Sequence, residues 1–372
     1  MSALSLAIVA LTTGWTVLGA TAVARITRMP PPHCSALEPV SVLKPLCGAD
    51  PSLRENLKSF FEQDHPAIQL VFGVEQADDA ALVVVRELIE AYPNVDATIV
   101  VGNAVRANNP KVKNLLGMLP HARHDLVLIS DSNVVAPRHY VRELAAIKAS
   151  DPEIGLVTNL FAGHGERSVG AMLECVELAG FVAAGSALPT AFGDAAVIGK
   201  SMLFSRGQLT SLGGLARVAD VLAEDYVLGK MFQLAGLRVA VAPTVLSNVV
   251  GALTLRAVFD RHLRWSMLRF RLRPAAFLLE PLTMPLCVLP IAAASWGPWA
   301  LVWAFAMWLL RDAVGWWLLR GKRSLHLPLL LGPWRDVMSL LVWFATPLKR
   351  HVSWRGNRVR VGAGTLLYAA RR

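Results

Sequence analysis

Two kinds of hydrophobic pattern alternate along this chain. Long uncharged stretches occur toward both ends, whereas residues 40–249 alternate short β-branched runs with segments that are apolar at every third or fourth position. Runs such as VSVL, IQLVFGV, ATIVV and LVLIS are typical of buried strands, and segments such as DDAALVVVRELIEAYP are typical of amphipathic helices. This alternation predicts an α/β domain with a mainly parallel sheet, at residues 38–252.

The first apolar stretch, residues 3–24, contains no charged residue and has about the length needed to cross a bilayer as a helix. A cleaved signal peptide is the alternative, because ATAVA resembles a cleavage site. That alternative lacks a basic region before the stretch, and the first positive charges, Arg25 and Arg28, follow it. Residues 1–27 are therefore interpreted as a transmembrane anchor, and the positive-inside rule predicts that the α/β domain is cytoplasmic.

The last third of the chain contains three further apolar segments. Residues 253–273 carry six arginines among regularly spaced apolar residues, which predicts a basic helix at the membrane surface. Residues 274–320, divided by SWGP, predict a transmembrane hairpin. The apolar part of 324–372 is interrupted by Arg335 and Asp336, and a full crossing would put both charges in hydrocarbon. We therefore expect re-entrant or interfacial helices there, followed by a basic tail.

Composition supports a membrane protein, since 54% of the 372 residues are hydrophobic and only 17% are charged. The net charge of +10 does not indicate nucleic acid, because the basic residues accompany apolar stretches where anionic lipid headgroups attract them. The four cysteines form no C-x-x-C pair, which argues against a zinc site and against a disulfide framework. We expect the α/β domain to lie in a reducing compartment.

Carboxylates follow two of the predicted strands. Asp78 and Asp79 come after IQLVFGVEQA, and Asp131, Ser132 and Asn133 come directly after LVLIS. Ligands of α/β sheets bind outside the carboxyl ends of strands, where an aspartate can hold a divalent cation that neutralises a diphosphate. Helix capping is the alternative, because the segment after Asp131 also leads into a predicted helix.

Two later segments offer complementary chemistry. In LAEDY, Asp225 could accept a proton from an attacking hydroxyl, although Glu224 and Asp225 could also just favour the positive end of a helix dipole. In RHLRW, Arg261 and Arg264 lie three residues apart and therefore share a helix face, where their guanidinium groups could bind a leaving phosphate or only lipid headgroups.

One apparent motif is discarded. The segment GDAAVIGKS at residues 193–201 resembles a phosphate-binding P-loop, but five residues separate its two glycines where the motif has four. The segment MLFSR that follows also favours a strand rather than the helix that a P-loop requires.

Several segments in a fixed order carry a family resemblance: VSVLKPLCGADPSLRENLKSFF, DDAA, YPNVDA, NPKVKNL, SDSN, GGLARVADVLAEDY and RHLRW. Together they resemble the ceramide glucosyltransferase family (family 21 glycosyltransferases) and its bacterial members that glycosylate hopanoids. The likeness covers roughly residues 39–275, with apolar segments in the expected places on both sides. The ordered set is specific, although no single segment is.

The resemblance implies a nucleotide-diphospho-sugar transferase domain of the GT-A type, which moves a hexose from a UDP-sugar to a lipid hydroxyl with inversion. Asp79 matches the first family aspartate, which implies a contact with the uridine part of the donor. Asp131 matches the second, near metal and diphosphate, and Asp225 matches the third, the catalytic base. Lys44 in LKPL and Lys111 in NPKVKNL are implied to line the nucleotide pocket.

The resemblance also assigns catalytic roles to Arg261, Arg264 and Trp265, which match the final arginine–tryptophan motif. One departure concerns the metal. Many sugar transferases have Asp-x-Asp at this point, whereas this chain has Asp131 and the uncharged Asn133, so Mg²⁺ or Mn²⁺ is expected there with reduced affinity.

The expected protein is a multi-pass enzyme of the inner (cytoplasmic) membrane whose catalytic domain faces the cytoplasm. Its expected partners are a UDP-sugar donor, a membrane lipid acceptor (ceramide or hopanoid) and the bilayer, with no nucleic acid. Two alternatives remain: a processive polysaccharide synthase and a catalytically silent lipid-binding scaffold. A scaffold has no reason to gather Asp79, Asp131, Asp225 and Arg264 around one pocket.

Overall fold

The computed structural model describes residues 3–32, 34, 37–50, 52–102, 105–194, 196–354 and 357–369, and the side chains of 352–358 and 369 are left aside. The chain forms two compact units. We call residues 28–161 and 189–249 the sheet unit, and residues 1–27, 162–188 and 250–372 the helical unit. Each unit has an architecture of its own.

The sheet unit is built on an eight-stranded sheet with the order β3-β2-β1-β4-β7-β6-β8-β5. The strands are β1 (Val40–Pro45), β2 (Ile68–Val74), β3 (Asp96–Val101), β4 (Leu126–Ile129), β5 (Val134–Val135), β6 (Ile154–His164), β7 (Met202–Ser205) and β8 (Arg238–Val249). β1 pairs in parallel with β2 and β4, and β2 in parallel with β3, whereas β7 is antiparallel to β4 and β6. The predicted α/β class with a mainly parallel sheet is confirmed.

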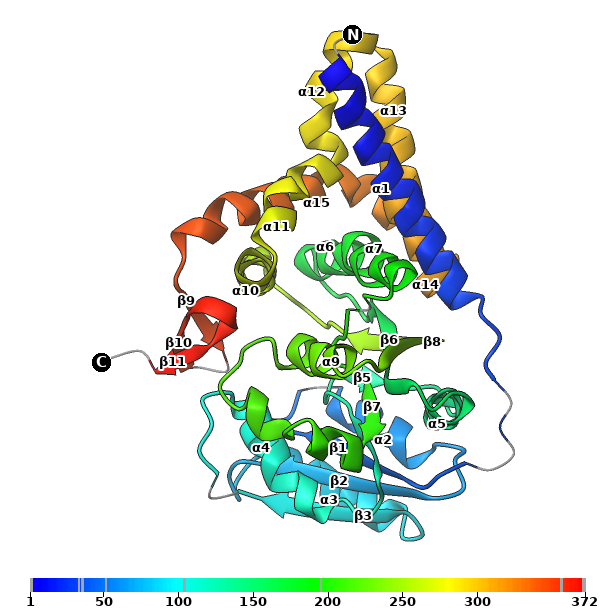
Figure 1. Ribbon diagram of the computed structural model, residues 1–372, viewed down its shortest axis with the longest axis vertical. Helices are drawn as coiled ribbons and strands as arrows, with labels where there is room; N and C mark the ends of the chain where they lie inside the picture. The colour runs from blue at the N-terminus through cyan, green and yellow to red at the C-terminus, as the bar shows by residue number, and fades with distance from the viewer. Residues whose placement is uncertain are drawn as a thin grey trace. The chain divides into compact units, whose positions relative to one another are not determined.

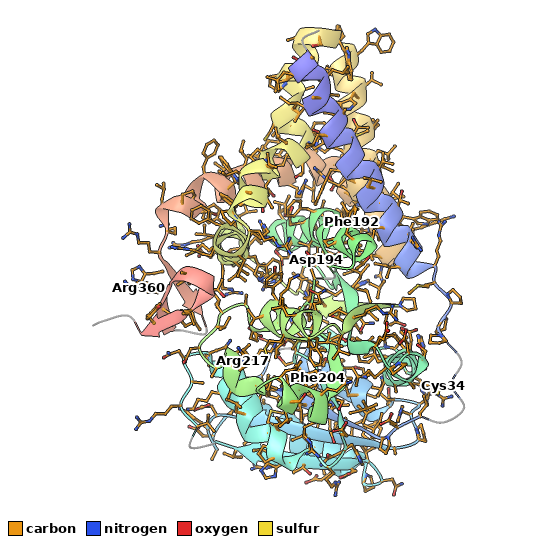
Figure 2. The ribbon with its side chains drawn as sticks, viewed as in Figure 1. Cys34, Phe192, Asp194, Phe204, Arg217 and Arg360 are labelled. Atoms are coloured by element: carbon orange, nitrogen blue, oxygen red, sulfur yellow. The ribbon has the colours of Figure 1, made fainter. Side chains whose placement is uncertain are left out.

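Helices of the sheet unit pack on this sheet (Figure 1). They are α2 (Leu53–Phe61), α3 (Ala81–Ala91), α4 (Pro110–Met118), α5 (Tyr140–Ser150), α8 (Arg206–Ser211) and α9 (Glu224–Leu234). The core includes Phe204 of β7, labelled in Figure 2, and Phe232 of α9. α4 lies directly on β2, because a Cβ at Gly73 would come within 2.3 Å of the sulfur of Met118.

The strand order creates a crevice. β1 lies between β2 and β4, so the chain turns to one side of β1 for β2 and β3 and returns to the other side for β4. Connections that leave two neighbouring parallel strands in opposite directions open a ligand site at the strands' carboxyl ends. Lys44 near the end of β1 and Asp131 after β4 therefore lie at this point.

The helical unit consists mainly of helices, most of which are apolar. They are α1 (Ala3–Thr27), α6 (Val169–Glu177), η2 (Leu178–Val182), α7 (Ala183–Ala187), α10 (Leu255–Leu272), α11 (Pro274–Leu279), η5 (Glu280–Thr283), α12 (Pro285–Trp296), α13 (Trp299–Trp308), η6 (Leu309–Val314), α14 (Gly315–Arg320) and α15 (His326–Ala345). α1 packs along the hairpin of α12 and α13 (Figure 1), through Val9, Val288 and Ala300 among others.

Four helices in the described part of the chain are long and apolar enough to cross a membrane: Ala3–Thr27, Val169–Phe192, Trp299–Arg320 and His326–Leu348. A bent pair, Pro274–Thr283 with Pro285–Trp296, makes five if it counts as one span. The sequence analysis did not identify the stretch that begins at Val169. Within residues 274–320 the chain turns at Gly297, between α12 and α13, and the transmembrane placement of this hairpin stays a prediction.

The C-terminal segment differs from the expectation. Where re-entrant or interfacial helices were expected, a single helix, α15, runs without a break through Arg335 and Asp336, and both charges are buried with 1% and 0% exposure. The reason is that both side chains find charged partners inside the helical unit, described in the Discussion. The tail then forms a small antiparallel sheet of β9 (His351–Trp354), β10 (Asn357–Val361) and β11 (Leu367–Ala369), which the sequence analysis did not predict. Residues 355–356 and 370–372 of the expected basic tail lie outside the described residues.

Candidate active site

Asp131 occupies the centre of a charged cluster at the carboxyl end of β4. Its Oδ1 lies 2.9 Å from Nζ of Lys111, and its Oδ2 lies 3.2 Å from Nζ of Lys200. Its backbone oxygen accepts a hydrogen bond of 2.6 Å from Nζ of Lys44. Burial alone would raise the pKa of Asp131, but Lys111 and Lys200 outweigh burial and hold that pKa below the usual range. The carboxylate therefore stays charged at neutral pH.

Lys111 enters the cluster from the start of α4. Asn109 caps this helix, since its side-chain oxygen accepts hydrogen bonds from the N–H groups of Lys111 (3.0 Å) and Val112 (3.1 Å). Nζ of Lys111 lies 3.1 Å from Oε1 of Glu224 and donates to the backbone oxygen of Gly199 at 3.0 Å. Burial opposes the charge, but Asp131 and Glu224 raise the pKa of Lys111 above its ordinary value. Lys111 is thus a permanent cation between carboxylates.

Asp225 begins α9 beside Glu224. Its Oδ2 accepts a hydrogen bond of 2.7 Å from the N–H of Gly199, and its Oδ1 accepts one of 2.7 Å from the N–H of Tyr226. Burial raises the pKa of both Glu224 and Asp225. A carboxylate whose pKa is raised holds a proton more firmly once it has accepted one, which suits a general base.

Lys44 is the cluster member whose charge is most easily changed. Its side chain is fully buried, with Nζ 3.6 Å from the centre of the Phe60 ring. Burial lowers the pKa of Lys44 well below its ordinary value, although Asp131 acts in the opposite direction. An anion that arrives beside Lys44 would favour its protonated form.

These side chains form what we call the lysine cluster: Lys44, Lys111, Asp131, Lys200, Glu224 and Asp225. All come from the sheet unit, and its three ammonium groups face three carboxyl groups. The structure therefore brings together four residues that the sequence singled out, Lys44, Lys111, Asp131 and Asp225. It adds Lys200.

The expected metal ligands lie beside Lys200. Its Nζ lies 2.8 Å from Oδ1 of Asn133 and 3.2 Å from Oδ2 of Asp131. These two oxygens are hard ligands of the kind that Mg²⁺ accepts together with phosphate oxygens and water, so the donor set fits. The flexible side chain of Lys200 has to turn away for a cation to bind both. Among the described residues, no three of His, Cys, Asp and Glu gather as a metal site.

Asp79 lies at a different place from the lysine cluster. Both of its carboxylate oxygens lie 3.0 Å from the N–H of Gly48, and Oδ1 also accepts a hydrogen bond of 2.9 Å from the N–H of Ala81. Asp79 thus ties the loop after β2 to the loop after β1 at the start of α3. Its expected contact with uridine stays a prediction.

The arginine–tryptophan motif lies on α10 in the helical unit. Arg261, Arg264 and Trp265 are half-buried along one side of this helix, which Thr254 caps by accepting a hydrogen bond of 3.1 Å from the N–H of Ala257. The rings of Trp265 and His262 are nearly perpendicular, at 86°, with their centres 5.2 Å apart. That this motif and the lysine cluster act on one donor molecule stays a prediction.

Sequence reasoning missed Lys200 and Gly199, although both lie in the segment dismissed as a false P-loop. The role of Gly199 is visible only in the structure, where a Cβ would lie 2.7 Å from Nζ of Lys111 and 3.2 Å from Oδ2 of Asp225. Only glycine lets its own N–H and C=O reach both groups. Lys200 had no signal of its own, since its partner Asp131 lies 69 positions away in the chain.

The chain is similar to known glycosyltransferases. The family model described as glycosyl transferase family 21 matches residues 2–367. Ceramide glucosyltransferase 1 of Caenorhabditis elegans is 30% identical over 243 residues, which are 65% of this chain and 52% of that protein. A ceramide glucosyltransferase of Komagataella phaffii is 37% identical over 102 residues, which cover 26% of this chain and 20% of the relative. The chain thus spans about half the length of the nematode relative.

A solved structure shares the fold. The mannosyltransferase PcManGT from Pyrobaculum calidifontis, determined in complex with GDP-Man and Mn²⁺, superposes with a TM-score of 0.55 at 21% identity, over 93% of this chain and 98% of that one. At this identity the likeness concerns the fold alone, and it confirms the predicted nucleotide-sugar transferase architecture. With the match over nearly its whole length, the chain belongs to glycosyl transferase family 21 and is a glycosyltransferase.

Proposed function

We propose that this glycosyltransferase moves a hexose from a UDP-sugar to a hydroxyl group of a membrane lipid, ceramide or a hopanoid, with inversion at the anomeric carbon. The observation that carries the proposal is the lysine cluster: Asp225 and Lys111 converge on Gly199, and Lys111 connects them to Asp131. The relatives named ceramide glucosyltransferases support a lipid acceptor.

Asp225 is the proposed general base. Two backbone N–H groups hold its carboxylate in one orientation, and its raised pKa suits it to receive the proton of the attacking lipid hydroxyl. Such assistance is commonly worth about 10²–10⁴-fold in rate. The hydroxyl oxygen then attacks the anomeric carbon as the bond to the diphosphate breaks, and UDP carries away the bonding electrons.

The lysine cluster is proposed to bind the diphosphate. Its ammonium and carboxyl groups already balance in number, so the diphosphate adds negative charge that requires a further cation. Asp131 and Asn133 are the proposed ligands of Mg²⁺ or Mn²⁺, which when bound would offset the charge of the leaving group. Lys111 provides a permanent positive charge beside the diphosphate, and Lys44 gains its proton when the anion binds. Asp79 is proposed to contact the uridine part.

The arginine–tryptophan motif completes the proposal. Arg261 and Arg264 are suited to the leaving diphosphate, because guanidinium stays charged and binds oxygens in pairs. Trp265 offers a flat apolar surface for the sugar or the lipid. We propose that the protein resides in the inner (cytoplasmic) membrane with the sheet unit in the cytoplasm, which agrees with its four helices of membrane-spanning length in the described residues.

The decisive variant is Asp225→Asn. It keeps the size of the side chain and removes the base, so transfer should fall by about 10²–10⁴-fold while UDP-sugar affinity stays within about twofold. The matched control is Asp194→Asn, since Asp194 pairs with Lys230 of the same helix, outside the lysine cluster. For each variant, turnover of the labelled UDP-sugar in membranes that contain the protein measures the transfer rate. Binding of the same UDP-sugar measures the affinity.

Retained turnover in Asp225→Asn, or an equal loss in Asp194→Asn, would contradict the assignment of the base. Product analysis separates the remaining alternative, because a single-sugar glycolipid supports lipid glycosylation and a polymer supports a polysaccharide synthase. Offering ceramide, bacteriohopanetetrol and diacylglycerol with several UDP-sugars identifies the acceptor and the sugar.

A further inference from the structure

Glu174 of α6 holds the arginine–tryptophan motif from within the helical unit. Its Oε1 lies 2.9 Å from Nη1 of Arg261, and its Oε2 lies 2.6 Å from Nε2 of His262. His262 in turn packs edge-on against Trp265. The carboxylate of Glu174 thus contacts Arg261 directly and Trp265 through the imidazole of His262.

The carboxylate of Glu174 is buried, so water cannot take the place of Arg261 or His262 as its partner. The side chain of Glu174 is 0% exposed, whereas that of Arg261 is 29% exposed. A buried carboxylate that loses a cationic partner is strongly disfavoured, so the pair resists rotation or sliding of α10 along α6. The exposed part of Arg261 remains available to a ligand while its inner part is fixed.

Further contacts fix the start of α10 on the same helix. A Cβ at Gly170 would lie 2.4 Å from the backbone oxygen of Leu253, so α6 and the segment before α10 touch backbone to backbone. Ser168 donates a hydrogen bond of 2.7 Å to that oxygen and accepts one of 2.9 Å from the N–H of Leu253. Gly170 and Glu174 are four residues apart and therefore share one face of α6.

We propose that Glu174 is a positioning residue for the transfer reaction: it sets the rotation and register of α10 so that Arg261, Arg264 and Trp265 are presented to the donor in reactive orientation. The inference rests on the proposed function, because it acts through the motif. It concerns a residue outside every segment that pointed to the activity, and it predicts a loss in kcat rather than in donor binding.

The chain contains a matched control for a merely structural role. Glu177 lies one turn further along α6, is 7% exposed, and pairs with Arg335 of α15 at 2.8 Å instead of with the motif. Glu174→Gln and Glu177→Gln remove one buried charge each from the same helix. Only the first should change the geometry of the arginine–tryptophan motif.

The experiment compares these variants in the full-length protein, with rates expressed per folded molecule. Glu174→Gln should lower kcat by about 10²-fold, the scale of a small misplacement of catalytic groups, and leave the KM for UDP-sugar within about twofold. Glu177→Gln should keep kcat within about twofold, and Glu174→Asp should recover part of the loss. In an Arg264→Gln background, Glu174→Gln should add little, because both act through one motif.

Two results would overturn the inference: equal kcat losses in Glu174→Gln and Glu177→Gln, or losses that multiply fully when Glu174→Gln and Arg264→Gln are combined. The proposed function fails in a different way. If Arg264→Gln alone keeps full turnover, the motif has no role in transfer and the assignment of the arginines is wrong.

Discussion

The two units each contain a charged cluster, and the contrast between them indicates what each is for. In the sheet unit the cations are lysines, which come from the end of β1, the start of α4 and the loop before β7. In the helical unit a second group of buried charges uses arginines, and we call it the arginine cluster: Glu177, Arg311, Asp312, Arg335 and Asp336. Lysine is a point charge on a flexible stem whose pKa responds to its surroundings, whereas arginine is planar and stays charged. The lysine cluster is therefore suited to a ligand that comes and goes, and the arginine cluster to fixed geometry.

Ion pairs connect the members of the arginine cluster with one another. Nη1 of Arg335 lies 2.8 Å from Glu177, and its Nη2 lies 2.5 Å from Asp336. Arg311 contacts Asp312 at 2.7 Å and Asp336 at 3.0 Å. The glycine of η2 allows this closeness, since a Cβ at Gly180 would lie 2.3 Å from an oxygen of Asp312. These ion pairs thus join α6, η6 and α15 inside the helical unit.

The largest expected effect follows from breaking the arginine cluster. Arg335→Met leaves the buried Glu177 without its cation, although Arg311 still pairs with Asp336, and this loss should cost about 3–5 kcal/mol of stability. The control is Arg238→Met, whose ion pairs with Asp151 and Glu153 are exposed and are worth at most about 1 kcal/mol. Thermal unfolding of the two variants in detergent measures the difference.

A compensating variant tests the cause. Replacing Glu177 by leucine together with Arg335→Met removes both charges of one pair and should recover a large part of the stability. If the double variant is no more stable than Arg335→Met, the loss comes from packing, and the charge argument for this cluster is wrong.

The sequence predicted the site better where chemistry depends on neighbours in the chain. Asp131 could be identified because an aspartate directly after a buried strand lies at the ligand edge of a parallel sheet. Asp225 was singled out in LAEDY, Lys111 and Lys44 were identified through the resemblance, and the structure places all three in one cluster with Asp131. The sheet class was predictable for the same reason, since strand and helix periodicities are local.

Prediction from the sequence failed for residues whose role depends on a partner far away in the chain. Arg335 and Asp336 were expected to face hydrocarbon if their helix crossed the membrane. Their sequence neighbours do not indicate that Glu177, 158 positions before Arg335, is a partner. Lys200 was overlooked because it lies in the segment that was rejected as a P-loop. Glu174 could not be identified because its partner Arg261 lies 87 positions away in the chain. Composition and periodicity contain no information on such pairs.

The second prediction sharpens the view that the lysine cluster receives a divalent cation. Asn133→Asp adds a charged oxygen beside Asp131, so the Mn²⁺ concentration for half-maximal activity should fall about tenfold, equivalent to about 1.4 kcal/mol. Asp131→Asn should raise it. Titration of transfer activity with Mn²⁺ after chelator treatment provides the measurement, and an unchanged titration in both variants would place the metal elsewhere.

The smallest expected effects are pH dependences, of kcat in the sheet unit and of stability in the helical unit. In the sheet unit, burial raises the pKa of Asp225, and only the ionised base accepts a proton, so kcat should fall as pH drops through a value above that of an ordinary aspartate, about 3.9. In the helical unit, burial opposes the charge of His262, but Glu174 outweighs burial and raises its pKa. The other groups that titrate or carry charge on α10 are Arg256, Asp260, Arg261, Arg264, Arg269 and Arg271, and those on the helices packed against it are Glu174, Glu177, His326, Arg335 and Asp336.

For His262 the sign follows from its raised pKa. The stabilisation from its ion pair with Glu174 is complete below the pKa of an unfolded histidine, about 6.5, and is lost as pH rises through the higher folded value. Stability should therefore decline on the alkaline side while kcat declines on the acid side. His262→Gln should remove the alkaline decline in stability and leave the acid limb of kcat in place, because no charge of the lysine cluster is changed. If His262→Gln moved both limbs together, the Glu174–His262 pair would be coupled to the lysine cluster, and the two pH dependences would not belong to separate units.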